Sequence, residues 1–264
     1  MYDMHNHTLY SDDSNATMKS MVDAGVQQSL KGIAITDHYD PDYPTPDFQF
    51  TPDFSAYQKE MEELKEAYRD KIEVILGIEI GIQHGSTLDK CRSAAGEYPY
   101  DFILGSFHCA HGKDLYVDYF NDWSIEEAYH GFYQYMLACL EKYDNFDVLG
   151  HINIIDRYTS RIPSYGPYME EIEAILRLLV DRGKGLEINT SSFRYNLGDV
   201  TTPSLKILAL YKDVGGEIIT LGSDAHSPRH VGYKLDWAED FAKSQGFKYY
   251  AHYKNRLPIF EKMD

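Results

Sequence analysis

The chain begins with MYDMHNHTLYSDDS (residues 1–14), in which His5 and His7 lie two positions apart in a strand-like run. Side chains at positions i and i+2 of a β-strand point the same way, so both imidazoles can face one ion. Asp12 and Asp13 follow a few residues later. Histidine is a frequent metal ligand, and nearby carboxylates add negative charge to such a site. We interpret this stretch as a first strand that presents a two-histidine clamp.

Six further apolar runs have the composition of strands that are covered on both faces. They lie at residues 32–36, 73–80, 101–107, 146–151, 185–189 and 217–223. Segments with helical character lie between the strands, at 17–30, 54–69 and 124–143, and Thr202–Pro203 reads as the start of another helix. Alternating strands and helices predict a parallel sheet with right-handed crossovers. We therefore predict an α/β fold, a closed or nearly closed barrel in which residues 1–264 form a single domain.

Composition excludes several classes of protein. The formal net charge of −17 argues against a nucleic-acid partner. Three cysteines without a CxxC pair are typical of reduced, cytosolic thiols. Residues 1–30 lack the pattern of a signal peptide, and no apolar run approaches the roughly 18 residues of a membrane span. We expect a cytoplasmic protein without membrane contact, and the sequence leaves its oligomeric state open.

Six of the eleven histidines lie at or just after the end of an expected strand. They are His5, His7, His38, His108, His151 and His226. Glu79 and Asp224 share these strand ends. The carboxyl ends of parallel barrel strands meet at one face, so we expect these side chains to form one metal cluster. Glu79 lies in an apolar run, where a metal would remove the cost of a buried, unpaired carboxylate. We expect Asp3 and Asp37 to orient ligand imidazoles by contacting them outside the metal-binding nitrogen.

The motifs at these strand ends resemble the series that defines the PHP (polymerase and histidinol phosphatase) superfamily. The matching motifs are Asp3-x-His5-x-His7-Thr8, 36-TDH-38, 77-GIE-79, 105-GSFH-108, 149-LGH-151 and 222-GSDAH-226. The resemblance runs along almost the whole chain in the family's order. It implies a distorted, TIM-like (β/α)7 barrel that binds two or three divalent ions and cleaves phosphoesters. The stretches 149–158, 187–195 and 222–233 are similar to those of PHP-type histidinol-phosphate phosphatases, which act in histidine biosynthesis.

Carried over to this sequence, the resemblance implies three divalent metal ions. The first would be held by His5, His7, Glu79 and Asp224, and Glu79 would bridge to a second ion on His108 and His151. The third would bind His38, His226 and Asp13, with Asp12 as the alternative acid. Zinc, manganese and iron all suit such a mixed donor set. We expect a metal-bridging hydroxide to attack phosphorus, with Asp224 and His230 as candidates to protonate the leaving oxygen.

Three arginines follow strand ends at the same face and could bind the phosphate. Arginine suits bidentate contact with phosphate, and Arg157, Arg161 and Arg194 are the candidates, together with His230 near the mouth. The irregular loop 39–54 supplies Tyr39, Tyr43 and Phe48 as candidates for an aromatic rim. Long irregular loops are often functional, although a rigid connector is an equal alternative here.

The sequence leaves three functions open. The first is a metal-dependent phosphatase for histidinol phosphate, a small-molecule phosphomonoester. The second is a phosphoesterase of the same superfamily with another small phosphomonoester as its substrate. The third is a non-catalytic metal-binding module, against which the full set of ligand residues argues. A nuclease would need a basic track for its substrate, and the acidic composition argues against one.

Overall fold

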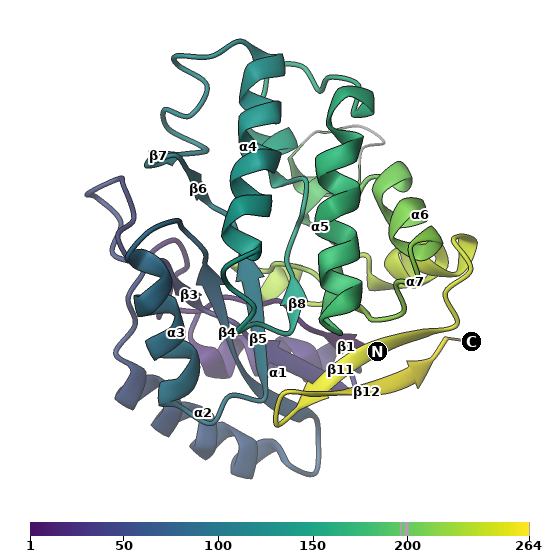
Figure 1. The fold of residues 1–264 in the computed structure, drawn as a ribbon. Helices are drawn as coiled ribbons and strands as arrows, with labels where there is room; N and C mark the ends of the chain where they lie inside the picture. Colours follow the sequence, from purple (N-terminus) through teal and green to yellow (C-terminus); the bar gives the residue numbers. More distant parts are fainter. Residues whose placement is uncertain (196, 198–200, 264) are drawn as a thin grey trace.

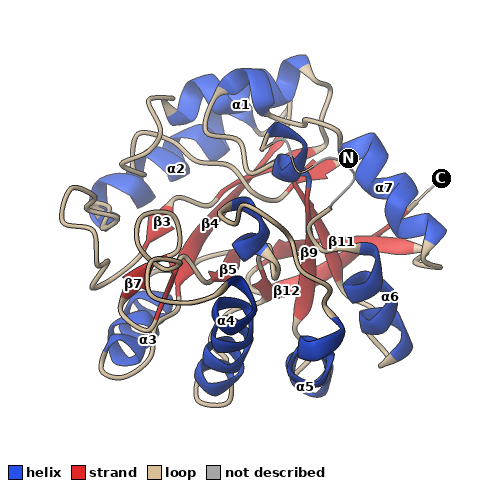
Figure 2. Cartoon of the chain, turned by 90° about the horizontal axis from the view of Figure 1, so that it is seen from above, coloured by secondary structure: helices blue, strands red, loops and turns tan. Residues whose placement is uncertain are grey.

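Among the described residues, seven parallel strands form the centre of the molecule, and helices surround them (Figures 1 and 2). The computed structural model describes residues 1–195, 197 and 201–263. In the order in which they are hydrogen-bonded, the strands are β1 (Tyr2–Asp3), β2 (Gly32–Ile35), β4 (Glu73–Gly81), β5 (Phe102–Ser106), β8 (Val148–Leu149), β9 (Gly185–Asn189) and β10 (Ile219–Gly222). A short strand, β3 (His38–Tyr39), also pairs with β4 in parallel. All seven predicted strands are therefore present.

The first and last strands of this order meet and close the barrel. The main-chain N–H of Met4 donates to the carbonyl of Leu221 at 2.9 Å, and that of His7 donates to the carbonyl of Ala225 at 2.8 Å. Asn6 and Ala225 form a parallel bridge between these hydrogen bonds. The residues that follow β1 thus lie beside those that follow β10, and the predicted α/β barrel is confirmed.

In the part of the chain that the structure describes, seven α-helices pack around the strands. They are α1 (Met18–Gln27), α2 (Phe54–Tyr68), α3 (Thr87–Glu97), α4 (Ile125–Leu140), α5 (Met169–Asp181), α6 (Leu205–Asp213) and α7 (Leu235–Ser244). The predicted capping box opens α4, because the Ser124 hydroxyl accepts from the N–H of Glu127 and the Glu127 carboxylate accepts from the N–H of Ser124. The predicted helix start at Thr202–Pro203 is wrong. Thr202 forms a bridge with Asn189, and α6 begins at Leu205 after Ser204.

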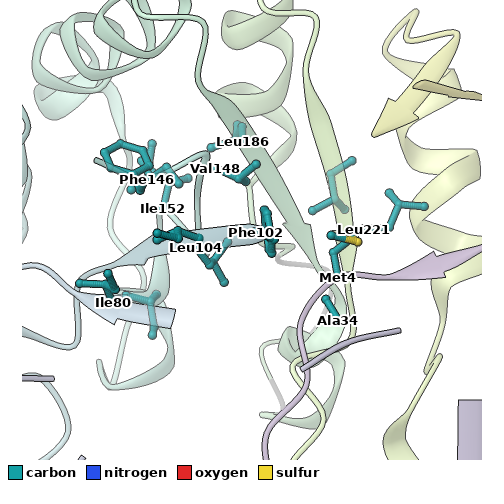
Figure 3. Packing of buried hydrophobic residues seen from close by; sticks show 14 of the residues in the cluster. Met4, Ala34, Ile80, Phe102, Leu104, Phe146, Val148, Ile152, Leu186 and Leu221 are labelled. Atoms are coloured by element: carbon teal, nitrogen blue, oxygen red, sulfur yellow. The ribbon is translucent and has the colours of Figure 1, made fainter. Parts of the chain in front are cut away.

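Apolar side chains from the strands and the inner helix faces form the core. Ile80, Leu104, Val148 and Leu186, seen in Figure 3, are fully buried. Helix α2 buries Tyr57, Met61, Leu64 and Tyr68, which recur at the spacing of one helical face. Strands and helices therefore share one interior, and the carboxyl ends of the strands are held in fixed positions relative to one another.

A C-terminal hairpin that the sequence reading missed covers the amino ends of the strands. Strand β11 (Tyr249–Lys254) pairs with β12 (Leu257–Lys262) in antiparallel fashion, and Figure 1 places the hairpin beside the N-terminus. Tyr2 stacks on His252 with a ring-centroid distance of 3.7 Å. The N–H of Asn255 donates to Asp101, just before β5. The opposite end of the barrel is left for the polar residues of the strand ends. Within the described residues, no helix is long and apolar enough to cross a membrane.

Candidate metal centre

The six strand-end histidines lie together at the carboxyl ends of the barrel strands, around Glu79. His5 and His7 follow β1, and His38 lies in β3. His108 and His151 come two residues after β5 and β8, and His226 follows β10. The barrel therefore brings together residues from its whole length, as the sequence predicts for one face of a parallel barrel.

Both carboxylate oxygens of Glu79 face imidazole nitrogens, and its side chain is fully buried. Oε1 lies 2.9 Å from Nε2 of His151 and 3.4 Å from Nε2 of His108. Oε2 lies 2.9 Å from Nδ1 of His38 and 3.3 Å from Nε2 of His5. Glu79 thus lies between two groups of imidazoles, and each of its oxygens faces one group.

Asp224 is the second carboxylate of the cluster. Its Oδ1 lies 3.5 Å from Nε2 of His7, 3.7 Å from Nε2 of His5 and 3.5 Å from Nδ1 of His226. The backbone of Asp224 is left-handed, with φ of 53°, a conformation that non-glycine residues seldom adopt. This conformation belongs to the turn after β10, which directs the carboxylate into the cluster.

The structure separates the two candidate acids of residues 12 and 13. Oδ2 of Asp13 lies 3.0 Å from Nε2 of His226 and 3.6 Å from Nε2 of His38. Asp12 instead accepts a hydrogen bond from the main-chain N–H of Gln49 in the long loop. The geometry therefore favours Asp13 as the ligand, the choice that the resemblance preferred.

The donor atoms fit divalent cations. Four overlapping sets of three residues place one ligand atom each within 4.8 Å of the others: His5, His7 and Asp224; His5, Glu79 and His151; His7, His38 and His226; and His38, Asp40 and His108. Oε2 of Glu79 and Nδ1 of His38 are buried and only 2.9 Å apart, yet they are not aligned for a hydrogen bond and neither atom has another hydrogen-bond partner. Buried polar atoms without partners are costly, and a bound cation would satisfy them.

Close, buried charges shift the pKa values of the cluster in both directions. Burial would raise the pKa of Glu79, but the charges of the imidazoles around it hold that pKa well below its usual value. Burial and the neighbouring imidazoles of His226 and His38 hold the pKa of His7 well below the usual range. Although burial lowers the pKa of His5, His38 and His108, the neighbouring carboxylates raise it above the usual value, so a binding metal would have to displace protons from these rings.

Two buried carboxylates that support the cluster were not predicted. Oδ1 of Asp40 lies 2.8 Å from Nδ1 of His108, and Oε1 of Glu187 lies 2.6 Å from Nδ1 of His5. Such partners orient a ligand imidazole through its second nitrogen. A signal was present for Glu187, which interrupts an apolar strand as Glu79 does. Asp40 lies in a loop of many acids, where nothing in the sequence distinguishes it.

Asp37 and Asp3 were predicted to orient ligand imidazoles. Asp37 is linked to a ligand imidazole through Ser11. The Ser11 hydroxyl donates to Asp37 at 2.7 Å, and the same hydroxyl oxygen lies 3.2 Å from Nδ1 of His7. The contacts of Asp3 differ from the expectation. Its carboxylate accepts from the N–H and hydroxyl of Ser223, so it braces the main chain before Asp224 and contacts no imidazole ring.

Arg157 is the arginine that lies in the wall of the cavity above the cluster. It belongs to the short 3-10 helix η1 (Ile154–Arg157), and its Nη2 donates to Asp224 at 2.9 Å and to Asn189 at 3.3 Å. Its guanidinium also lies over the ring of Tyr195. Arg157 therefore has the position predicted for a phosphate-binding residue.

Arg161 and Arg194 are placed differently from the prediction. Arg161 is exposed, forms a surface ion pair with Glu126 and does not line the cavity, so the structure gives no support to its predicted phosphate contact. Arg194 donates to the carbonyls of Ser223 and Asp224 at 2.9 and 2.7 Å. Its guanidinium nitrogens thus hold the turn that carries Asp224, and Arg194 is not part of the cavity wall.

His230 and the aromatic loop lie near the mouth. His230 ends the short helix η4 (Pro228–His230), outside the cavity lining, and its catalytic role stays a prediction. Of the three predicted rim residues, Tyr43 lines the cavity. Phe48 stacks on the lining residue Phe50, which the prediction omitted, and Tyr39 packs instead against Phe54.

A closed parallel barrel with clustered imidazoles and carboxylates at its carboxyl ends defines a metalloenzyme of the α/β-barrel class. Comparison with known families agrees, since residues 3–191 match the PHP domain. The chain belongs to the PHP domain family.

Several relatives extend over nearly the whole chain. A Clostridium acetobutylicum protein named "Probable histidinol-phosphatase" is 33% identical over 252 residues, which cover 94% of this chain and 95% of the relative. The histidinol-phosphatase of Lactococcus lactis is 29% identical, covering 93% of this chain and 91% of the relative. A crystal structure of the Lactococcus lactis histidinol phosphate phosphatase, complexed with zinc, L-histidinol and phosphate, superposes with a TM-score of 0.88 at 25% identity and covers 98% of both chains.

Neighbouring acids allow a matched test of the proposed ligands. We expect Asp13→Asn to lower the zinc content of reconstituted protein, because the amide loses the negative charge between His38 and His226. Asp12→Asn should retain wild-type zinc content, because Asp12 contacts only the long loop. Elemental analysis of both purified variants provides the measurement. Equal zinc loss in the two variants would contradict the assignment.

Proposed function

We propose that this protein is a metal-dependent phosphomonoesterase that hydrolyses L-histidinol phosphate to L-histidinol and phosphate. The observation that carries the proposal is the position of Glu79 between two groups of imidazoles, because His38 and His151, which contact Glu79, line a cavity together with Arg157. The histidinol-phosphatase relatives that match almost the full chain support the choice of substrate.

We infer that the cluster holds divalent cations through its predicted ligands. His5, His7, Glu79 and Asp224 would hold one cation. Glu79, His108 and His151 would hold a second, and Asp13, His38 and His226 a third. Cations bound there would neutralise the phosphoryl oxygens and lower the pKa of a water that attacks phosphorus. The zinc in the solved relative supports divalent cations as the cofactor.

Arg157 is the residue that we propose contacts the phosphate. Its Nη2 donates hydrogen bonds to Asp224 and Asn189, but its Nε is buried without a hydrogen-bond partner. A phosphoryl oxygen at the cavity wall would supply that partner through a charge-assisted hydrogen bond. The ion pair with Asp224 also fixes the guanidinium before a substrate arrives, so little side-chain freedom is lost on binding.

The far wall of the cavity suits the cationic part of histidinol phosphate. Tyr43 and Phe50 supply aromatic surface for an imidazole, and their rings meet edge to face. Asp114 lies in the hairpin of β6 (Cys109–Ala110) and β7 (Lys113–Asp114) and lines the same cavity. Its carboxylate accepts from the hydroxyl of Thr45 and the N–H of Tyr116, both neutral donors. We propose that its negative charge attracts the ammonium group of the substrate.

Arg157 and Arg161 form a matched pair for testing the phosphate contact. Arg157→Ala should lower kcat/KM by about 100-fold or more on every phosphomonoester, because a charged donor to the transition state is lost. Arg161→Ala removes an exposed guanidinium and should leave kcat/KM close to wild type. Zinc content must be measured in both, since Arg157 touches Asp224. Wild-type turnover by zinc-loaded Arg157→Ala would contradict the role.

The substrate assignment is tested by comparing histidinol phosphate with a neutral phosphomonoester on zinc-reconstituted protein. Wild type should prefer histidinol phosphate, and Asp114→Asn should lose most of that preference while it hydrolyses the neutral ester normally. Asparagine can keep both local hydrogen bonds, because the Thr45 hydroxyl can also accept, so the change removes mainly charge. A wild-type enzyme without any preference would indicate the alternative, a phosphatase for another small phosphomonoester. Equal losses on both esters would give Asp114 a structural role.

A further inference from the structure

Glu187 is a buried carboxylate in the middle of β9 that contacts two separate parts of the metal centre. Its Oε1 lies 2.6 Å from Nδ1 of His5, and its Oε2 accepts from the main-chain N–H of His151 at 2.9 Å. Oε2 also accepts from Nδ2 of Asn189 at 3.1 Å. Only 1% of Glu187 is exposed, so water cannot replace these donors.

The contact with His5 determines which ring nitrogen faces the cluster. A carboxylate accepts hydrogen bonds, so the proton of the neutral imidazole resides on Nδ1. Nε2, the nitrogen that remains for a metal, lies 3.3 Å from Oε2 of Glu79 and 3.7 Å from Oδ1 of Asp224. This orientation leaves the nitrogen that a metal requires free to bind.

Gly222 in β10 provides the space for this pair. A Cβ atom at residue 222 would lie 2.3 Å from Oε1 of Glu187 and 2.7 Å from Cβ of His5. Both distances are shorter than non-bonded atoms tolerate. The glycine is therefore needed where the carboxylate meets the imidazole, and this observation is independent of the hydrogen bonds.

We propose that Glu187 is a positioning residue that fixes the ring of His5 and the main chain of His151 relative to each other. Under the proposed function, on which this inference rests, His5 and His151 hold different cations on either side of Glu79. One carboxylate would then set the spacing of two cation sites, although it binds neither cation itself.

The test is zinc binding by full-length Glu187→Gln, measured in competition with a chromophoric chelator. Each oxygen of Glu187 faces a donor, so the NH2 group of glutamine must oppose either the Nδ1–H of His5 or the donors at Oε2. Zinc affinity should fall about 10- to 100-fold, the range typical when such a supporting partner is lost. Gly222→Ala should also lower zinc affinity, because it displaces the carboxylate while leaving its charge in place.

Asp147→Asn is the matched control, because Asp147 is a buried carboxylate at the opposite end of the barrel. It accepts from the N–H of Ile103 and from Arg256, away from the cluster. Asp147→Asn should bind zinc as wild type does. Wild-type zinc affinity in Glu187→Gln or in Gly222→Ala would overturn the proposal.

The zinc-free proteins separate positioning from folding. Zinc-free Glu187→Gln should unfold thermally near zinc-free Asp147→Asn, and unfolding far below that control would make the role structural and overturn the proposal. The readout is independent of turnover. If wild type binds zinc but does not hydrolyse histidinol phosphate, the proposed function fails, whereas the zinc affinities still decide the role of Glu187.

Discussion

The burial of the Glu79 carboxylate among five histidines is the constraint on which the rest of the site depends. A carboxylate without solvent needs hydrogen-bond donors or compensating positive charge around it. Imidazoles lie on both sides of it, and those nearest Oε2 are close to it but not aligned for a hydrogen bond. The barrel provides this arrangement because its strands end at one face and are closed by hydrogen bonds between the segments after β1 and β10. The closed barrel therefore brings together the side chains that we propose bind the cations.

Behind the candidate ligands, close packing leaves room only for particular side chains. Gly81 faces Asp40, whose Oδ1 would lie 1.8 Å from a Cβ at that position, and Gly222 faces Glu187 in a similar way. In both places a glycine on one strand admits a carboxylate that reaches the second nitrogen of a histidine. The orientation of the ligand histidines thus depends partly on two glycines, which leave space for the carboxylates but contact no ligand through a side chain.

The sequence predicted the features that have a local signature. Apolar β-branched runs identified the seven barrel strands, and polar residues at their ends identified the residues that gather around Glu79. Prediction from the sequence failed where a residue's structure depends on contacts with residues far away in the chain. The Asn255–Arg256 turn of the hairpin has two positive φ angles but lacks the glycine that usually marks such a turn. Thr202 resembles a helix cap, yet it pairs with Asn189. Arg161 and Arg194 follow strand ends as Arg157 does, and only the folded chain shows that they contact Glu126 and main-chain carbonyls.

The most direct test of the account is the turnover of histidinol phosphate by zinc-loaded Glu79→Gln, with its zinc content measured in parallel. Glutamine keeps the shape of the side chain but removes the charge that both groups of imidazoles face. We predict a folded protein with reduced zinc content and a kcat at least about 100-fold below wild type, as expected when a shared electrostatic centre is lost. Wild-type turnover with wild-type zinc content would contradict the account, because the centre would then function without its bridging carboxylate.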